Sequence, residues 1–366
     1  MKIICVVGTR PEAIKMAPII QRLKKESWAD TRVLATAQHR EMLDQVLDLF
    51  GIKPDTDLDI MRANQSLAEL TSRLMSAVDK YLMCEMPDIV LAQGDTTTVF
   101  VVALACFYRN IRFGHVEAGL RTGDLNNPFP EEANRVLVSR LAYYHFAPTI
   151  KARDNLLREG YSDQEIYTTG NTVIDALLDT ASKNIEFVHD SDNNKRMILV
   201  TAHRRENFGK PFLNICRAIK DLADQFMDLE FVYPVHPNPN ILDVATKELG
   251  NHPRIHLIEP LDYGPFVSAM KKSYLILTDS GGVQEEAPAL GKPVLVFRSE
   301  TERPEAVEEG VVKLVGTDRE VIVAEATQLL TDSNEYSRMA KGVSPYGDGH
   351  AAERIINVIK EYKDSL

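Results

Sequence analysis

The sequence predicts an α/β protein with two domains, each built on a parallel sheet covered by helices. Three observations support this prediction. Short apolar runs of strand length alternate with longer segments whose apolar residues recur every three to four positions. The same alternation restarts after Gly170. The length of 366 residues also exceeds what one hydrophobic core usually organises. We therefore expect two Rossmann-like domains, residues 1–169 and 170–366.

The first half opens with a strand at Lys2–Val7 that ends at Gly8, followed by a helix at Glu12–Lys25 with helical apolar spacing. Strands and helices then alternate, which implies a parallel sheet with both faces covered. The further strands expected are Thr31–Ala37, Asp88–Gln93, Arg112–Val116 and Tyr144–Ala147, and the further helices are Glu41–Phe50, Leu67–Met86, Thr96–Tyr108 and Glu131–Leu141.

The second half repeats this order around a polar loop at His189–Lys195. The last segment, Gly349–Lys363, is expected to form one helix, which in two-domain folds of this kind can cross back onto the first domain. No repeat period is visible, which excludes solenoids and propellers. The strands expected here are Met197–Thr201, Phe231–Val235, Ile255–Leu257, Leu275–Thr278, Pro293–Phe297 and Val312–Leu314.

Composition excludes several classes of protein. Forty-two basic and 53 acidic residues give a net charge of −11, which argues against a general binder of nucleic acid or anionic membranes. The apolar runs are far shorter than the ~20 residues of a bilayer span. The apolar run at the N-terminus is also too short for the core of a secretory signal. The cysteines form no CxxC pair, so we expect reduced core residues of a cytoplasmic protein and no zinc site. These are Cys5, Cys84, Cys106 and Cys216.

Polar residues follow the expected strands at their carboxyl ends, where open parallel sheets bind ligands. Both halves of the chain show this pattern, so we expect an active site in the cleft between the two domains. The residues concerned are Arg10, Lys15, Asp95, Glu117 and Glu131 in the first half, and His203, His236, Asp279 to Gly282 and Arg298 in the second.

The residue types indicate what these loops do. Arg10 and Lys15 lie where a helix opens directly after a strand, and a helix N-terminus attracts anions. Asp95 precedes three threonines, so it is a candidate both for the N-cap of the following helix and for a catalytic role. Glu117 follows a buried strand, where a carboxylate is costly unless it is paired.

The histidines are interpreted by their positions. His203 lies between a strand and two arginines, which favours a role in the site. His115 lies inside its strand and is interpreted as a core histidine, whereas His39 is ambiguous.

The segment Asp279-Ser280-Gly281-Gly282 is typical of a phosphate site, because two glycines let the backbone approach closely and the following helix amides point at the anion. Glu285 and Glu286 follow in the first turns of that helix. A carboxylate there can accept hydrogen bonds from a ribose diol, although an ordinary acidic first turn is the alternative.

Two glycine motifs do not fit the sites that they resemble. The segment 347–352 matches G-x-G-x-x-A, but no strand precedes it and no acidic residue follows at ~20 positions, as a nicotinamide site requires. Gly291-Lys292-Pro293 has no Ser or Thr after the lysine and is no P-loop. We therefore expect no cofactor.

Long motifs spread along the chain, among them GTRPEAIKMAP (8–18), QGDTTT (93–98) and GHVEAGLRTGD (114–124), resemble those of the bacterial non-hydrolysing UDP-N-acetylglucosamine 2-epimerases, and the resemblance covers nearly the whole length. The resemblance implies the two-domain GT-B fold and interconversion of UDP-GlcNAc and UDP-ManNAc, which supplies ManNAc for bacterial surface polysaccharides. It also implies a homodimer that needs no nicotinamide or metal. The motifs are GTRPEAIKMAP (8–18), QHREML (38–43), QGDTTT (93–98), GHVEAGLRTGD (114–124), PEEANR (130–135), GNTVIDAL (170–177), HRRENFG (203–209), YPVHPNPN (233–240), LTDSGGVQEEAPALGKPVLVFR (277–298) and TERPEAV (301–307).

The resemblance also assigns roles to residues. Some relatives have Gln where this chain has Leu261, so a side-chain contact to the base is not expected there, while a backbone contact is open. Some relatives bind a second UDP-GlcNAc near the segment matching Gln38 and His39. The implied roles are Arg10 and Lys15 at the diphosphate; Asp95, Glu117, Glu131 and His203 in catalysis; Phe266 at uracil; Ser280, Gly281 and Gly282 at phosphate; Glu286 at the ribose; and Arg303 at the nucleotide.

The chemistry explains why such residues are needed. The hydrogen on carbon 2 of the sugar is not next to a carbonyl, so a side-chain base cannot remove it directly. Expelling UDP first builds positive charge on the ring and acidifies that hydrogen, which gives a 2-acetamidoglucal. This route needs cations on the leaving diphosphate and acid and base groups at both faces of carbon 2.

Three alternatives stay open at this point. A GT-B glycosyltransferase would share the nucleotide half but needs an acceptor groove and fewer clustered carboxylates. A hydrolysing epimerase would release free ManNAc, and a fused sugar-kinase domain would need a longer chain. A non-catalytic UDP-sugar sensor would have no use for four titratable groups, of which three lie in the first domain and the fourth is His203.

Overall fold

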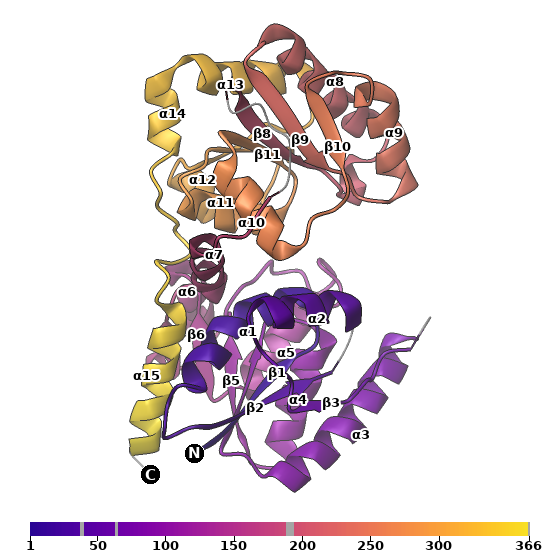
Figure 1. The fold of residues 1–366 in the computed structure, drawn as a ribbon. Helices are drawn as coiled ribbons and strands as arrows, with labels where there is room; N and C mark the ends of the chain where they lie inside the picture. Colours follow the sequence, from indigo (N-terminus) through magenta and orange to yellow (C-terminus); the bar gives the residue numbers. More distant parts are fainter. Residues whose placement is uncertain (37–39, 63–64, 188–193, 365–366) are drawn as a thin grey trace. The chain divides into compact units, whose positions relative to one another are not determined.

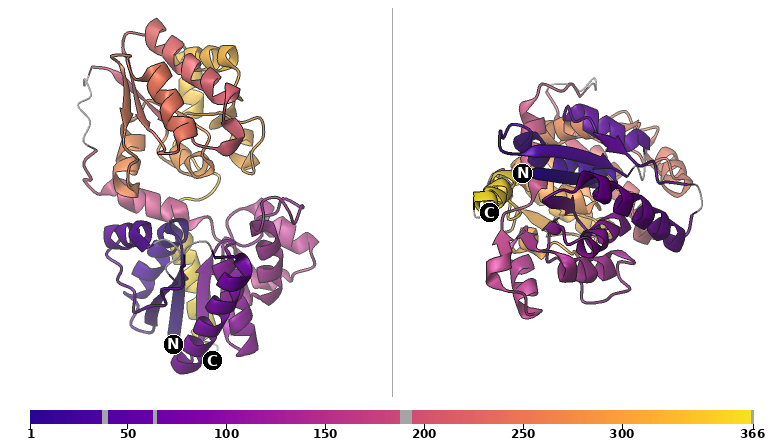
Figure 2. Two further views of the ribbon diagram at one scale, coloured as in Figure 1. Left: turned by 90° about the vertical axis from the view of Figure 1, so that its right-hand side faces the viewer. Right: turned by 90° about the horizontal axis from the view of Figure 1, so that it is seen from below.

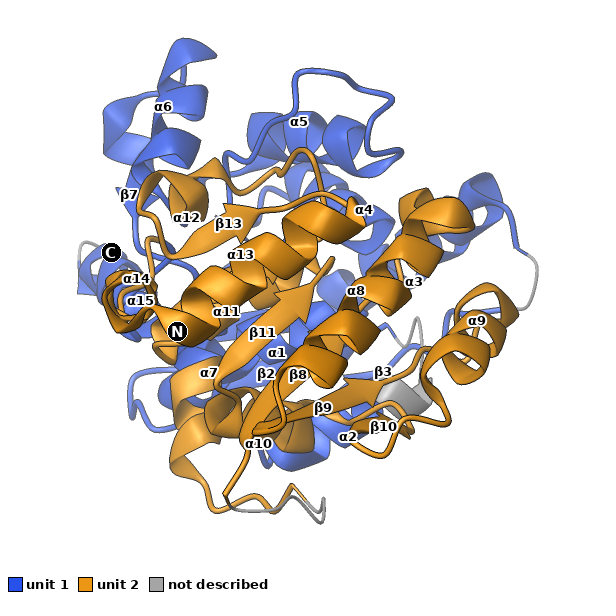
Figure 3. Cartoon of the chain, turned by 90° about the horizontal axis from the view of Figure 1, so that it is seen from above, with its two compact units in different colours: residues 1–176, 346–366 blue, residues 177–345 orange. Residues whose placement is uncertain are grey.

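The computed structural model describes residues 1–36, 40–62, 65–187 and 194–364 (Figure 1). The chain forms two compact units (Figure 3): unit 1 comprises residues 1–176 and 346–366, and unit 2 comprises residues 177–345. Each unit is a parallel sheet with helices on its faces, so the expected α/β class with two parallel sheets is confirmed. Residues 170–176 and 346–366, which the sequence analysis grouped with the second domain, lie in unit 1.

Unit 1 contains a seven-stranded parallel sheet in the order β3-β2-β1-β4-β5-β6-β7. Its strands are apolar enough to be buried on both faces; β1 pairs in register with β2 on one side and β4 on the other. The strands are β1 (Lys2–Val7), β2 (Asp30–Ala35), β3 (Thr56–Asp57), β4 (Ile89–Gln93), β5 (Arg112–Val116), β6 (Tyr144–Ala147) and β7 (Ile166–Thr168).

The helices of unit 1 cover both faces of this sheet (Figure 2), and one core cluster is built from β1, β4, α3 and α4. Helix α1 begins at Arg10, earlier than expected, because Thr9 and Glu12 form a capping box. The helices are α1 (Arg10–Leu23), α2 (Arg40–Leu49), α3 (Leu67–Glu85), α4 (Thr97–Tyr108), α5 (Glu131–Leu141), α6 (Ile150–Arg158), the start of α7 (Thr172–Ser182) and α15 (Ala351–Asp364), with the 3-10 turn η1 (Asp163–Glu165).

Unit 2 contains a six-stranded parallel sheet in the order β10-β9-β8-β11-β12-β13. A core cluster of this unit packs the sheet against α8, α9 and α13. The strands are β8 (Arg196–Thr201), β9 (Leu229–Pro234), β10 (Ile255–Ile258), β11 (Leu275–Thr278), β12 (Val294–Val296) and β13 (Val312–Leu314). The other elements are η2 (Arg205–Asn207), α8 (Lys210–Gln225), α9 (Pro239–Leu249), α10 (Tyr263–Lys272), α11 (Gly281–Ala289), α12 (Pro304–Glu308), α13 (Arg319–Thr331) and α14 (Ser333–Met339).

Both sheets have a topological switch point, where the strand order reverses. In unit 1 it lies between β1 and β4, and in unit 2 between β8 and β11. Loops that leave a sheet at such a point diverge and open a crevice at the carboxyl ends of the strands. The loops with Arg10 and Asp95 follow the first pair, and those with His203 and Asp279 follow the second.

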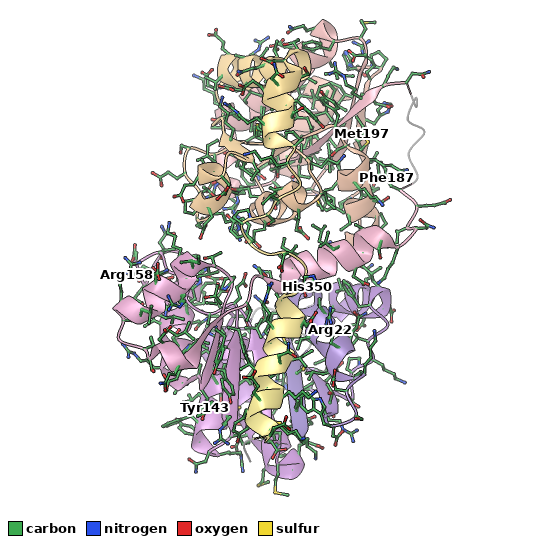
Figure 4. The ribbon with its side chains drawn as sticks, turned by 90° about the vertical axis from the view of Figure 1, so that its left-hand side faces the viewer. Arg22, Tyr143, Arg158, Phe187, Met197 and His350 are labelled. Atoms are coloured by element: carbon green, nitrogen blue, oxygen red, sulfur yellow. The ribbon has the colours of Figure 1, made fainter. Side chains whose placement is uncertain are left out.

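Helix α15 belongs to unit 1 and packs against α1, where Arg22 and Glu353 approach to 3.6 Å. Figure 4 labels Arg22 on α1 and His350 at the start of α15. The Asp175 carboxylate accepts hydrogen bonds from the backbone N–H groups of Ala351 and Ala352, at 3.2 and 2.9 Å. This helix N-terminus is therefore already capped, which agrees with rejecting the segment 347–352 as a dinucleotide site.

The cysteines only partly match the expectation of core residues. Cys5, Cys106 and Cys216 are buried, but Cys84 is exposed. The buried positions of α3 recur every four residues up to Leu82, and Cys84 falls on the other face of that helix. Within the described residues, no helix is both long and apolar enough to cross a membrane.

Candidate active site

Glu117 is the centre of a hydrogen-bond network at the carboxyl end of β5. Its Oε1 accepts from Lys15 Nζ at 2.6 Å and from Asn171 Nδ2 at 2.8 Å, and its Oε2 accepts from Gln93 Nε2. Only 7% of the Glu117 side chain is exposed, and these three donors offset the cost of burying the carboxylate. Its backbone φ of 66° is left-handed, a strained conformation that is common at functional sites.

Asp95 lies in the loop after β4, and its carboxylate is held by an arginine. Oδ2 lies 2.6 Å from a terminal guanidinium nitrogen of Arg135 on α5, and Arg135 also binds Glu132 at 3.0 Å. The N-cap of α4 is Thr96, whose Oγ1 accepts from the Val99 N–H. Asp95 is therefore not the cap of that helix, which resolves one alternative that the sequence left open.

Glu12 is a buried carboxyl group that joins the loops after β1 and β4. Oε2 accepts from the N–H groups of Gly8 and Thr9, at 2.6 and 3.1 Å, and Oε1 accepts from Thr96 Oγ1 at 2.7 Å. Burial raises the pKa of Glu12 to about 7, and the nearby Asp95 acts in the same direction. No role was predicted for Glu12, although the T-x-x-E spacing of a capping box is visible at Thr9 and Glu12.

His115 is buried in β5, as expected for a core histidine. Its Nε2 lies 2.7 Å from the carbonyl oxygen of Gly94, directly before Asp95. Burial lowers the pKa of His115 to about 4, so the ring is neutral and Nε2–H donates to that carbonyl. The residue anchors the loop that carries Asp95.

Arg10 and Glu131 are each the first residue of a helix, α1 and α5 respectively. Neither side chain makes a hydrogen bond or ion pair with another residue of the described part of the chain. The structure therefore brings Lys15 and Glu117 into direct contact but does not bond Glu131 to Asp95 or Glu117. Gln38 and His39 lie outside the described residues.

In unit 2, the fully buried Asp279 shapes the loop that carries His203. Its carboxylate accepts from the backbone N–H groups of His203 and Arg204, at 3.0 and 2.9 Å, and from Asn207 Nδ2 at 3.0 Å. The imidazole of His203 is 45% exposed and stacks on His236, with ring centroids 5.9 Å apart.

Burial lowers the pKa of His203, although the Asp279 carboxylate acts in the opposite direction. The imidazole is therefore neutral near pH 7 and able to exchange a proton. Asp279 was predicted to belong to a phosphate motif, but its contacts show that it holds the His203 loop.

The start of α11 presents the glycines of the expected phosphate site. Ser280 is the N-cap residue but makes no side-chain cap bond, and Gly281 and Gly282 form the first turn. The Arg303 guanidinium lies over Gly281, so closely that a Cβ there would meet its nitrogen at 2.6 Å. Arg303 also pairs with Glu285. A helix N-terminus and a cation thus meet at one place, as an anion site requires.

The expected nucleoside residues lie on α10 and α11 of the same unit. Glu286 is 6% exposed, and its Oε1 accepts from the Tyr263 hydroxyl at 2.7 Å. Phe266 is half-buried on α10, and Leu261 lies two residues before that helix. In the described ranges, no group of three or more His, Cys, Asp or Glu side chains is arranged to hold a metal ion.

Comparison with known proteins identifies the family. The family model described as UDP-N-acetylglucosamine 2-epimerase matches residues 21–360. The chain is 53% identical to the UDP-N-acetylglucosamine 2-epimerase of Escherichia coli K12 over all of both chains. It is 54% identical to that of Bacillus subtilis 168, over 100% of this chain and 98% of the relative.

A solved structure agrees with these relatives. The UDP-GlcNAc 2-epimerase of Neisseria meningitidis, solved bound to UDP-GlcNAc, is 49% identical and superimposes with a TM-score of 0.89, covering 99% of this chain and 100% of that one. The match extends over both units and every candidate site loop. The chain therefore belongs to the UDP-N-acetylglucosamine 2-epimerase family.

Proposed function

We propose that this chain interconverts UDP-GlcNAc and UDP-ManNAc by the non-hydrolysing route, through elimination and re-addition of UDP. The observation that carries this proposal is the Lys15–Glu117 pair, 2.6 Å between Nζ and Oε1, at the carboxyl end of β5 in unit 1. A cation for a leaving diphosphate and a carboxylate for the sugar are thereby held together. The names of the relatives and the bound UDP-GlcNAc in the Neisseria meningitidis protein support the substrate.

In the proposed mechanism, Arg10, Lys15 and the N-terminus of α11 stabilise the negative charge that develops on UDP as the anomeric bond breaks. Positive charge on the ring then acidifies the hydrogen on carbon 2. A base removes it to give 2-acetamidoglucal, and an acid returns a proton at the opposite face before UDP adds again. The groups that supply this acid, base and charge chemistry are Asp95, Glu117, Glu131 and His203.

Unit 2 is proposed to bind the nucleotide. The Arg303 guanidinium above Gly281 supports a phosphate there, together with Ser280 and Gly282. The buried Glu286 carboxylate suits a ribose diol, and Phe266 suits the uracil face. The side chain of Leu261 is apolar, so any polar contact of this residue with the base would come from its backbone. Gln38 and His39 remain proposed contacts of a second, activating UDP-GlcNAc.

The test is a proton NMR experiment on UDP-GlcNAc with the protein in heavy water, with chelator and without nicotinamide. UDP-ManNAc carrying deuterium at carbon 2 is expected, because protein groups in exchange with water remove and return the proton. Product that keeps its original hydrogen would indicate a hydride route. Inactivity restored only by NAD or a divalent metal would contradict the proposal.

The same spectra separate the alternatives. Free ManNAc and UDP would indicate a hydrolysing epimerase, whereas transfer of the sugar only in the presence of an acceptor would indicate a glycosyltransferase. We further propose that the chain acts in the cytoplasm as a homodimer and that its product supplies ManNAc for bacterial surface polysaccharides.

The catalytic assignment is tested with isosteric variants. Asp95→Asn, Glu117→Gln, Glu131→Gln and His203→Asn are each expected to slow deuterium incorporation at least ~10²-fold, the usual scale for loss of an acid–base group. Their affinity for UDP, measured by calorimetry, is expected to change less than their rate. Near-normal exchange in all four variants would show that the catalytic set is misplaced.

A further inference from the structure

Asn171 touches a candidate catalytic carboxylate and lies where two distant segments of the chain meet. Its backbone N–H donates to the carbonyl oxygen of Tyr346 at 2.6 Å. Unit 1 ends at residue 176 and resumes at residue 346, so this bond joins the outgoing and returning segments of the chain. Gly170 and Gly347 allow the close approach; a Cβ on Gly347 would lie 3.4 Å from the backbone of Asn171.

The two ends of the Asn171 carboxamide have separate partners. Asn171 is the N-cap residue of α7, and its Oδ1 accepts from the N–H of Val173 at 3.1 Å. Nδ2 donates to Glu117 Oε1 at 2.8 Å, the oxygen that Lys15 also binds. Only 3% of Asn171 is exposed, so the orientation of the carboxamide is fixed by these bonds.

These two tasks together select asparagine. Asn, Asp and Ser are about equally good N-cap residues, so capping α7 would be satisfied by any of the three. Asp has no donor for Glu117 and would place a second carboxylate beside it. The Ser hydroxyl is one atom shorter and cannot occupy both positions. Among these three residues, only asparagine caps the helix and also donates to the carboxylate.

We propose that Asn171 is a positioning residue for the reaction, which holds the Glu117 carboxylate in place and fastens it to the paired segments at Asn171 and Tyr346. This inference rests on the proposed function, because it takes Glu117 as a group that acts on the sugar. Asn171 acts through Glu117, whose left-handed backbone conformation needs such support from its surroundings.

The test compares Asn171→Asp and Asn171→Ser, which keep the cap and remove the donor. Asn171→Ser is expected to keep a melting temperature close to that of the wild type, whereas Asn171→Asp is expected to lower it by placing a second carboxylate beside Glu117. In both variants kcat for deuterium exchange at carbon 2 is expected to fall about 10²-fold, the scale for a misplaced catalytic group. KM is expected to change less than about threefold. A kcat within about threefold of wild type in both variants would overturn the proposal.

Two control variants separate positioning from stability. Asn238→Asp makes the same substitution at the N-cap of α9, where Oδ1 accepts from the Asn240 N–H. It serves as the control for the effect of the substitution on the melting temperature. Asp175→Asn weakens the cap of α15 beside the same paired segments without touching Glu117. It is expected to lower the melting temperature and to leave kcat within about threefold of wild type.

A double-mutant cycle tests the contact without using turnover. Asn171→Asp is expected to lower the urea midpoint in the wild-type background but less in the Glu117→Gln background, where no second carboxylate faces it. Equal effects in both backgrounds would overturn the proposal. A wild-type protein without exchange would instead refute the proposed function, and the cycle would still decide whether Asn171 holds Glu117.

Discussion

Glu12 and Glu69 occupy the same local position in the sequence pattern but lie in opposite environments. Each is the third helical residue of a capping box, Glu12 in α1 and Glu69 in α3. Burial raises the pKa of Glu12 to about 7. Backbone and side-chain hydrogen bonds from Ser66 lower the pKa of the exposed Glu69. The glutamate of this motif therefore changes the free energy of unfolding with pH in one direction at Glu12 and in the opposite direction at Glu69.

The pair yields a prediction for Glu12→Gln. A carboxyl group whose pKa is higher in the folded protein binds its proton more tightly there, so its contribution to the free energy of unfolding falls between pH 4.5 and about 7. At about 1.4 kcal/mol per pH unit, wild type should lose up to about 3 kcal/mol relative to Glu12→Gln across this range. Urea unfolding at pH 5 and pH 8 measures the difference.

Glu69→Gln is the matched control, and the wild type is expected to gain stability relative to it as pH rises from acid, because the folded-state pKa of Glu69 is lowered. If the difference in the free energy of unfolding between wild type and Glu12→Gln did not change with pH, the Glu12 carboxyl would keep its charge when buried.

At the scale of single residues, sequence reasoning found side chains that stand directly after strands and missed those that hold them. Lys15 and Glu117 were visible because polar groups gather in the segments that follow the carboxyl ends of parallel strands. Asn171 lies 54 positions from Glu117, and Arg135 lies 40 positions from Asp95. Such pairs depend on how the strands are ordered in the sheet, which spacing along the chain does not encode.

At the scale of elements, buried strands were predictable because their apolar runs are distinct. The predictions for Lys2–Val7, Arg112–Val116 and Leu275–Thr278 match the observed strands residue for residue. The edge strands β3 and β7 were missed, since two or three residues are too few to show a period of two.

The loop after β5 gives a prediction about backbone conformation. Gly119 has a φ of 89°, and a Cβ there would run into the backbone carbonyl oxygen of Ala152 on α6. Gly123, in the same loop, has a φ of 85° and nothing within 4 Å. Gly119→Ala is therefore expected to cost more than about 3 kcal/mol, since overlap adds to backbone strain, and Gly123→Ala only about 1–2 kcal/mol. Equal losses in urea unfolding would mean that α6 moves aside without cost.

At the scale of the molecule, two sheets were predictable but the division of the chain was not. The alternation of strands and helices restarts once, which indicates two sheets. Residues 346–366 return to unit 1, and the contacts that place them there, such as Arg22 with Glu353, join the two ends of the chain. An amphipathic helix shows that it needs a partner face but does not identify which one.

The proposed homodimer gives the last prediction. Helices α3 and α4 pack together and are tied by the Arg109–Asp79 ion pair at 2.6 Å. Near their C-terminal ends, Met86 is 77% exposed and Phe107 is 61% exposed, with Met83 and Tyr108 beside them in sequence. Large apolar side chains gathered in this way are typical of a surface that another protein covers.

Light scattering at micromolar concentration is expected to give twice the mass of the chain for the wild type and the mass of one chain for Met86→Lys with Phe107→Lys. Each lysine would have to lose its hydration in an apolar interface, which costs several kcal/mol for each buried charge. Met227→Lys is the matched control, because Met227 is 69% exposed in unit 2, and it should leave the dimer intact. A monomeric wild type would refute the dimer, and dissociation only by Met227→Lys would place the interface on unit 2.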